Sequence, residues 1–124
     1  MSIKKFYRKK ITVSEAIDIA QIFNTETEDK FARFPDLYGK DEGVYNWEVS
    51  LDTICYLDDP VYIIDDNEVY PKFVTDNKFS IVCVGEDFIY AYDHLEFGDR
   101  DDLTKEDFIQ ALNYYLENDV FLDD

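Results

Sequence analysis

The sequence has few of the residues that most catalytic and metal sites require. One histidine and two cysteines among 124 residues leave little for a site built from imidazole and thiolate ligands. Glycine (4) and proline (3) are scarce, and there is no phosphate-binding loop, dinucleotide fingerprint or G-x-S-x-G motif. These absences predict a protein that is not an enzyme and that holds no metal or cofactor.

Long apolar stretches are also missing. No run approaches the roughly 18–20 residues of a membrane-spanning helix. The opening "MSIKKFYRKKITVSEA" has basic residues but lacks the apolar core of a secretory signal. Cys55 and Cys83 each lie inside an apolar, strand-like run, which is typical of buried reduced thiols rather than of a disulfide. The sequence therefore predicts a soluble, cytoplasmic protein, taken to be a monomer.

Positive charge is scarce as well, and this is the strongest signal in the chain. Twelve Lys and Arg residues stand against 29 Asp and Glu residues, for a net charge of −17. Five of the twelve fall within residues 1–10, which leaves seven basic and 29 acidic residues, a balance of −22, over residues 11–124. Nucleic acids and anionic membranes bind cationic surfaces, so neither is an expected partner. The charge favours a basic protein partner, although acidity can also serve solubility alone.

Apolar and aromatic side chains are plentiful. Hydrophobic residues make up 46% of the chain, with ten Phe and ten Tyr, which is enough for the core of one domain over residues 1–124. Apolar residues at three- and four-residue spacing predict helices from Thr12 or Ser14 to near Asn24, over residues 87–97, and from Thr104 onward. In residues 87–97 the alternation of apolar side chains leaves a strand as the alternative.

Strands are predicted in the middle of the chain. Residues 49–57 alternate in polarity, and "DDP" then turns the chain so that residues 61–66 return as the partner of a hairpin. Residues 78–85 are almost continuously apolar, which favours an inner strand. Pro71 marks residues 69–74 as a connection or an edge strand.

The other segments are predicted to be irregular. Residues 25–45 contain Pro35, Gly39 and Gly43 and are predicted to form a loop. Residues 1–10 are a basic arm, either flexible or an edge strand. The expected fold is therefore α+β: a small, mainly antiparallel sheet of about three to four strands, covered by an N-terminal helix and two C-terminal helices.

The acidic segments do not match a known cation site. "DRDDLTKED" has Leu103 at its fifth position and no glycine at its sixth, so it departs from the calcium-binding loop. His94, beside Asp93, is interpreted as a surface histidine rather than a general base. Paired carboxylates leave a small metal-dependent hydrolase as a third hypothesis for function.

The candidate binding surface combines aromatic and acidic side chains of the two C-terminal helices. Carboxylates pair with cations, and aromatic faces add apolar area and cation–π contact. The candidate residues are Tyr90, Asp93, Glu96, Phe97, Asp99, Asp101, Asp102, Tyr114 and Glu117. Alternatively, the aromatic residues pack beneath residues 25–45. If the interface lies elsewhere, the next candidates are Glu26, Glu28, Asp29, Asp41 and Glu42.

Two stretches carry a resemblance to known proteins. "YNWEVSLDTICYLDD" and "FIQALNYYLENDVFLDD" resemble a family of small bacterial α+β domains of unassigned function, in which a strand near a Trp leads to a closing A-x-x-Y-Y-x-x-N-D-x-F helix. The likeness runs roughly from Tyr45 to the end. The motif residues are typical of structure: we expect Asn118 and Asp119 to end the helix and Phe121 to return to the core. The remaining motif residues are Ala111, Tyr114 and Tyr115.

In size, acidity and fold class the chain is also similar to the immunity proteins of bacterial toxin systems, including contact-dependent growth inhibition. This resemblance implies a cytoplasmic inhibitor that binds and neutralises a cognate basic toxin domain, commonly a nuclease. The alternative hypothesis is an acidic adaptor or regulatory subunit that binds a basic host protein.

Overall fold

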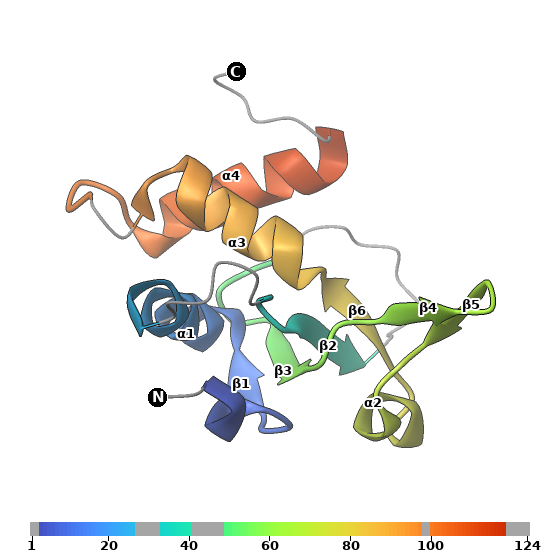
Figure 1. Cartoon of the computed structure of the whole chain (residues 1–124). Helices are drawn as coiled ribbons and strands as arrows, with labels where there is room; N and C mark the ends of the chain where they lie inside the picture. Colours follow the sequence, from blue (N-terminus) through green and yellow to red (C-terminus); the bar gives the residue numbers. More distant parts are fainter. Residues whose placement is uncertain (1–2, 27–32, 41–48, 98–99, 119–124) are drawn as a thin grey trace.

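Residues 3–26, 33–40, 49–97 and 100–118 are described by the computed structural model (Figure 1). In chain order its elements are η1 (Ile3–Phe6), β1 (Ile11–Thr12), α1 (Val13–Glu26), β2 (Asp36–Lys40), β3 (Ile54–Asp58), β4 (Tyr62–Ile64), β5 (Asn67–Val69), α2 (Lys72–Asp76), β6 (Phe79–Cys83), α3 (Gly85–His94) and α4 (Lys105–Asn118). Four strands form an antiparallel sheet in the order β1-β3-β2-β6, and β4 pairs with β5 in a separate sheet. The predicted α+β fold is confirmed. None of the helices among these residues is long and apolar enough to cross a membrane.

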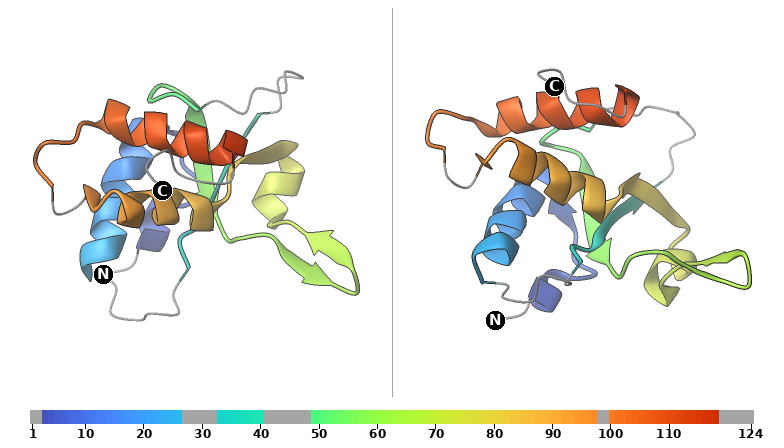
Figure 2. Two further views of the ribbon diagram at one scale, coloured as in Figure 1. Left: turned by 90° about the horizontal axis from the view of Figure 1, so that it is seen from above. Right: turned by 45° about the horizontal axis from the view of Figure 1, so that its top comes forward.

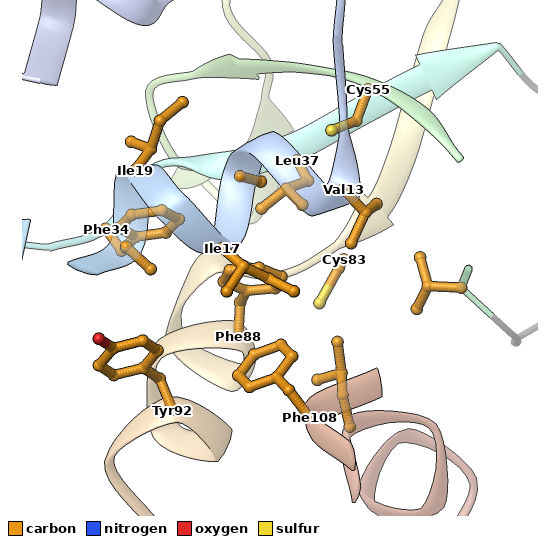
Figure 3. Close-up of a cluster of buried hydrophobic side chains, with 14 of the residues drawn as sticks. Val13, Ile17, Ile19, Phe34, Leu37, Cys55, Cys83, Phe88, Tyr92 and Phe108 are labelled. Atoms are coloured by element: carbon orange, nitrogen blue, oxygen red, sulfur yellow. The ribbon is translucent and has the colours of Figure 1, made fainter. Parts of the chain in front are cut away.

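The main core lies between one face of the four-stranded sheet and the helices α1, α3 and α4 (Figure 3). Leu37, Cys55, Leu57 and Cys83 line the sheet side, where alternate residues of each strand point the same way. Burial raises the pKa of the Cys55 thiol to about 12 and shifts that of Cys83 in the same direction. Both thiols are buried and free of any disulfide, as predicted.

The opposite face of the sheet is covered in part by the short helix α2. Rings from β3, β6 and α2 form a cluster in which Tyr56 stacks on Phe79 at 4.7 Å between centroids and Phe73 lies 5.7 Å from Phe79. Tyr38 is fully buried on this face, and its hydroxyl donates a 2.7 Å hydrogen bond to the carbonyl oxygen of Asp59. The sheet is therefore packed on both sides, although the second layer is small.

Two helices begin where their capping residues predict. At α1 the backbone N–H of Glu15 donates to the Thr12 hydroxyl (3.2 Å), and a Glu15 carboxylate oxygen accepts from the Thr12 N–H (3.1 Å). At α4 the Asp107 N–H donates to the Thr104 hydroxyl (3.2 Å), and Asp107 accepts from the Thr104 N–H (2.9 Å). The helix predicted over residues 87–97 is confirmed as α3, which ends earlier, at His94.

The prediction of a loop over residues 25–45 is wrong at its centre, because β2 lies between β3 and β6 in the sheet. Gly39, which suggested a chain break, is instead a position of close packing. A Cβ atom there would lie 2.9 Å from a methyl of Val82 and 3.1 Å from the carbonyl oxygen of Ile54. Strand β2 is thus interior although its sequence, "DLYGK", is neither continuously apolar nor rich in β-branched residues.

The predicted strand pairing also needs correction. Strand β4 pairs with β5 through Tyr62↔Val69 and Ile64↔Asn67, not with β3, whose neighbours are β1 and β2. Strand β6 lies at the edge of the sheet rather than inside it. The strand predicted over residues 49–57 begins only at Ile54.

Asn113 of α4 is partly buried and holds the segment that precedes β3. Its side-chain amide donates to the Val49 carbonyl and its side-chain oxygen accepts from the Val49 N–H, both at 2.8 Å. These two bonds satisfy the backbone of a buried residue that has no strand partner. The Asn113 side chain therefore links the segment that precedes β3 to helix α4.

The N-terminal segment, predicted to be flexible or an edge strand, packs along β3 from Tyr7 onward. Tyr7 forms a bridge to Leu57, the Arg8 N–H donates to the Leu57 carbonyl (2.9 Å), and β1 pairs with the start of β3. The Arg8 guanidinium donates two 3.2 Å hydrogen bonds to the carboxylate of Asp58. Because the Asp58 side chain is fully buried, this ion pair fixes the basic segment to the sheet.

Candidate partner-binding surface

The predicted surface on the C-terminal helices is only partly assembled. Tyr90 points outward from α3 with 52% of its area exposed, and its ring lies 5.6 Å from Tyr115 of α4 and 6.5 Å from His94. Asp93 is exposed beside them, and partial desolvation raises its pKa. We call Tyr90, Asp93, His94 and Tyr115 the helix surface. It joins an aromatic pair to at least one carboxylate.

Phe97 does not belong to the helix surface, and its predicted outward orientation is wrong. Helix α3 ends at His94, and Glu96 takes a φ of 52°, which turns the chain back toward the core. The Phe97 ring consequently lies 5.5 Å from Tyr92 and 5.6 Å from Phe108. Glu96 itself remains exposed.

The acids before α4 have different surroundings. Asp102 forms a bidentate ion pair with Arg100, with contacts of 2.6 and 3.0 Å, and this pair lowers the pKa of Asp102. Asp101 is exposed, and Asp99 lies outside the described residues. Lys105 turns away from these acids and binds the hydroxyl of Ser14 (2.9 Å) and the carboxylate of Asp18 (3.0 Å) on α1.

The remaining predicted residues lie at the far end of α4. Glu117 is exposed, whereas Tyr114 is partly buried and its carbonyl accepts a 3.0 Å hydrogen bond from the side chain of Asn118. Tyr115, not Tyr114, contacts Tyr90. Among the next candidates, Glu26 is the last residue of α1. The others, Glu28, Asp29, Asp41 and Glu42, lie outside the described residues, as do Asp119 and Phe121.

A second exposed surface is absent from the sequence-based prediction. The hairpin of β4 and β5, residues 62–69, extends outward at the periphery of the molecule (Figure 2). Tyr62, Ile63 and Ile64 are 53%, 61% and 51% exposed, and Asp65 and Asp66 form the turn that follows them. We call residues 62–69 the hairpin arm. A run of apolar residues in the sequence does not distinguish an exposed arm from a buried strand, so only the fold reveals it.

Two carboxylates of the described residues are deeply buried, and both have structural partners. Asp36 accepts hydrogen bonds from the N–H of Gly85 (2.8 Å) and of Val61 (3.3 Å). Asp58 is held by Arg8 and also accepts from the Asp59 N–H at 2.8 Å. Asp36 and Asp58 are cross-strand partners on β2 and β3. Their oxygens accept the hydrogen bonds that hold these chain segments together. Among the residues described, no three His, Cys, Asp or Glu side chains are grouped so that they could hold a metal ion.

No known protein-family description, curated protein sequence or solved structure matches this chain.

Proposed function

We propose that this protein is a cytoplasmic immunity protein, an inhibitor that neutralises a cognate basic toxin domain of the nuclease class by stoichiometric binding. One observation carries the proposal: large apolar side chains are exposed next to carboxylates on a domain of net charge −17. Soluble proteins seldom expose such side chains together unless they form an interaction site. Carboxylates around them suit a partner whose own surface is cationic.

The physical roles of the two kinds of residue differ. The overall negative field accelerates the encounter with a basic domain, and this effect weakens as salt is added. Apolar and aromatic anchors slow dissociation, because they lose water only in the docked complex. A nuclease binds phosphates with cationic residues, so a carboxylate-bearing surface can occupy the same site or one beside it.

The two buried carboxylates are not placed to act as a catalytic pair. A general acid or base must reach the proton that it transfers. Asp36 and Asp58 are 3% and 0% exposed, and their oxygens already accept hydrogen bonds from backbone or guanidinium groups. These hydrogen bonds account for the burial of both carboxylates, and no catalytic role is needed to explain it.

The gene's surroundings provide the probe that tests this proposal. An immunity protein is expected directly downstream of a gene for a large secreted protein with a variable C-terminal domain. That C-terminal domain, produced alone, should arrest growth, and co-expression of this chain should restore it. Calorimetry with an active-site-inactivated domain should give one-to-one binding, and stopped-flow mixing should give an association rate that falls as salt rises.

The control is co-expression of an unrelated immunity protein, which should not restore growth. The proposal is contradicted if no such gene lies upstream, or if the domain encoded there does not bind this chain. Stoichiometric binding to a basic host protein instead would favour the adaptor hypothesis.

A further inference from the structure

The hairpin arm exposes apolar side chains on both of its faces. In the register of β4 and β5, Tyr62 and Ile64 share one face and Ile63 lies on the other, opposite Glu68. All three apolar residues are more than half exposed, so neither face packs on the body of the domain. An isolated two-stranded hairpin is only marginally stable in water, and exposed isoleucines add nothing to its stability. Folding alone does not account for these residues.

The arm has an anchored base and a free tip. At the base the Val61 N–H donates to Asp36, and the Asp59 carbonyl accepts from the buried Tyr38 hydroxyl. Also at the base, the Tyr70 hydroxyl donates a 2.8 Å hydrogen bond to Glu68 on the arm itself. Both views show the arm extending away from α1, α3 and α4 (Figure 2). The arm is therefore presented in a defined direction.

The turn at the tip has an aspartate where glycine is preferred. Asp65 and Asp66 have φ values of 51° and 66°, and a two-residue turn with positive φ at both positions is the type I′ turn, which favours Asn-Gly or Asp-Gly. Two adjacent aspartates in this conformation add both strain and like-charge repulsion. Sequences that break a local rule in this way do so most often at functional sites.

The charge of the arm identifies the chemistry of its partner. Between Lys40 and Lys72 the sequence contains no Lys, Arg or His, while Asp65, Asp66 and Glu68 are exposed on the arm. A second copy docked arm to arm would bring these carboxylates together, and phosphate-bearing surfaces would repel them. The hairpin arm, with its exposed apolar side chains and anionic tip, fits a cationic cleft that has apolar walls.

We infer that the hairpin arm is the element that inserts into the cationic substrate cleft of the toxin domain, with Asp65 and Asp66 placed where the domain binds phosphate and Tyr62, Ile63 and Ile64 against the cleft walls. This inference rests on the proposed function and makes it more specific. The helix surface, the site predicted from the sequence, is the competing location.

Substitution on the arm separates the two locations. The probe is the inactivated C-terminal domain encoded upstream, titrated with wild-type protein and with Ile63→Ser, Ile64→Ser and Tyr62→Ser variants. Each arm variant should raise Kd roughly tenfold or more, mainly through faster dissociation, since each removes an apolar anchor. Ile54→Ser is the matched control, because Ile54 is an isoleucine 42% exposed on β3, away from the arm, and its loss should leave Kd unchanged. Equal circular dichroism spectra and melting temperatures would show that the variants fold.

The tip is tested by its charge alone. Asparagine tolerates positive φ at least as well as aspartate, so Asp65→Asn with Asp66→Asn should preserve the turn. The association rate should fall several-fold at low salt, and its salt dependence should flatten.

Each outcome has a definite meaning. Unchanged binding by all arm variants overturns the inference and leaves the proposed function intact, and a weakened Tyr90→Ala variant would then place the interface on the helix surface. Failure of the wild-type protein to bind the domain overturns the proposed function, and the inference fails with it. Self-association of the free wild-type protein that the arm variants abolish would identify a second copy as the occupant and would also overturn the inference.

Discussion

Replacing Asp36 with alanine is expected to lower the free energy of unfolding by about 2–4 kcal/mol. The carboxylate is buried and accepts a 2.8 Å hydrogen bond from the N–H of Gly85, the first residue of α3. Losing a buried bond to a charged acceptor costs about 1.5–3 kcal/mol, and loss of the charge beside the helix N-terminus adds roughly 0.5 kcal/mol. The longer 3.3 Å bond to the Val61 N–H adds a smaller amount.

The measurement is urea denaturation followed by circular dichroism, with the melting temperature as a second readout. For a domain of this size, about 2–4 kcal/mol corresponds to a fall of roughly 6–20 °C. Asp102→Ala is the matched control, since Asp102 is an exposed acid whose ion pair with Arg100 contributes little. A loss below about 1 kcal/mol in Asp36→Ala would refute the reasoning that this carboxylate holds α3 against β2.

Three further predictions follow from burial, close packing and charge. Gly85→Ala should destabilise the protein, because the added Cβ would overlap the carbonyl oxygens of Phe34 and Pro35. This overlap should outweigh the roughly 1 kcal/mol by which alanine is favoured over glycine in a helix. A variant that resists urea better than the wild-type protein would contradict this prediction. The buried Cys55 thiol stays protonated up to about pH 12 in the folded protein but ionises near pH 9 in the unfolded chain. The free energy of unfolding should therefore fall between pH 9 and pH 12, by up to about 1.4 kcal/mol per pH unit for this thiol. Urea denaturation at several pH values tests this, and a pH dependence of the unfolding free energy that is unchanged in Cys55→Ala would argue against it. Moderate salt should raise the melting temperature by screening the net charge of −17, and a flat response up to about 0.3 M would show that repulsion is weak.

The helices were predictable because their signals are local. Thr12 with Glu15 and Thr104 with Asp107 each form a capping pair within four residues, and apolar spacing sets the buried face. The end of α3 was not predictable in the same way. Glu96 adopts a positive φ, and that single residue moves Phe97 from the predicted outer surface into the core.

The sheet was harder to predict because its strands are determined by contacts between residues that lie far apart in the sequence. Asp36 and Gly39 are residue types typical of loops. However, Asp36 accepts a hydrogen bond from the N–H of Gly85 in α3, and Gly39 leaves room for the side chain of Val82 in β6. The candidate site shows the same limit. Tyr90 was correctly placed on the surface, whereas Ile63 and Ile64 resemble core residues until the pairing of β4 with β5 shows that nothing covers them.

The strand order β1-β3-β2-β6 has a consequence for how the chain reaches its native state. No two neighbouring strands of this sheet are joined by a tight turn, and its polar ties, Arg8–Asp58 and Asp36–Gly85, span 50 and 49 residues. Closing such long loops before any contact forms is slow, so the sheet should assemble late and on a timescale of about milliseconds to seconds. The β4–β5 hairpin can form in microseconds but provides no template for the sheet. The element proposed to bind the partner can therefore form early, but it gains a fixed position only when Asp36 of β2 binds the Val61 N–H at its base.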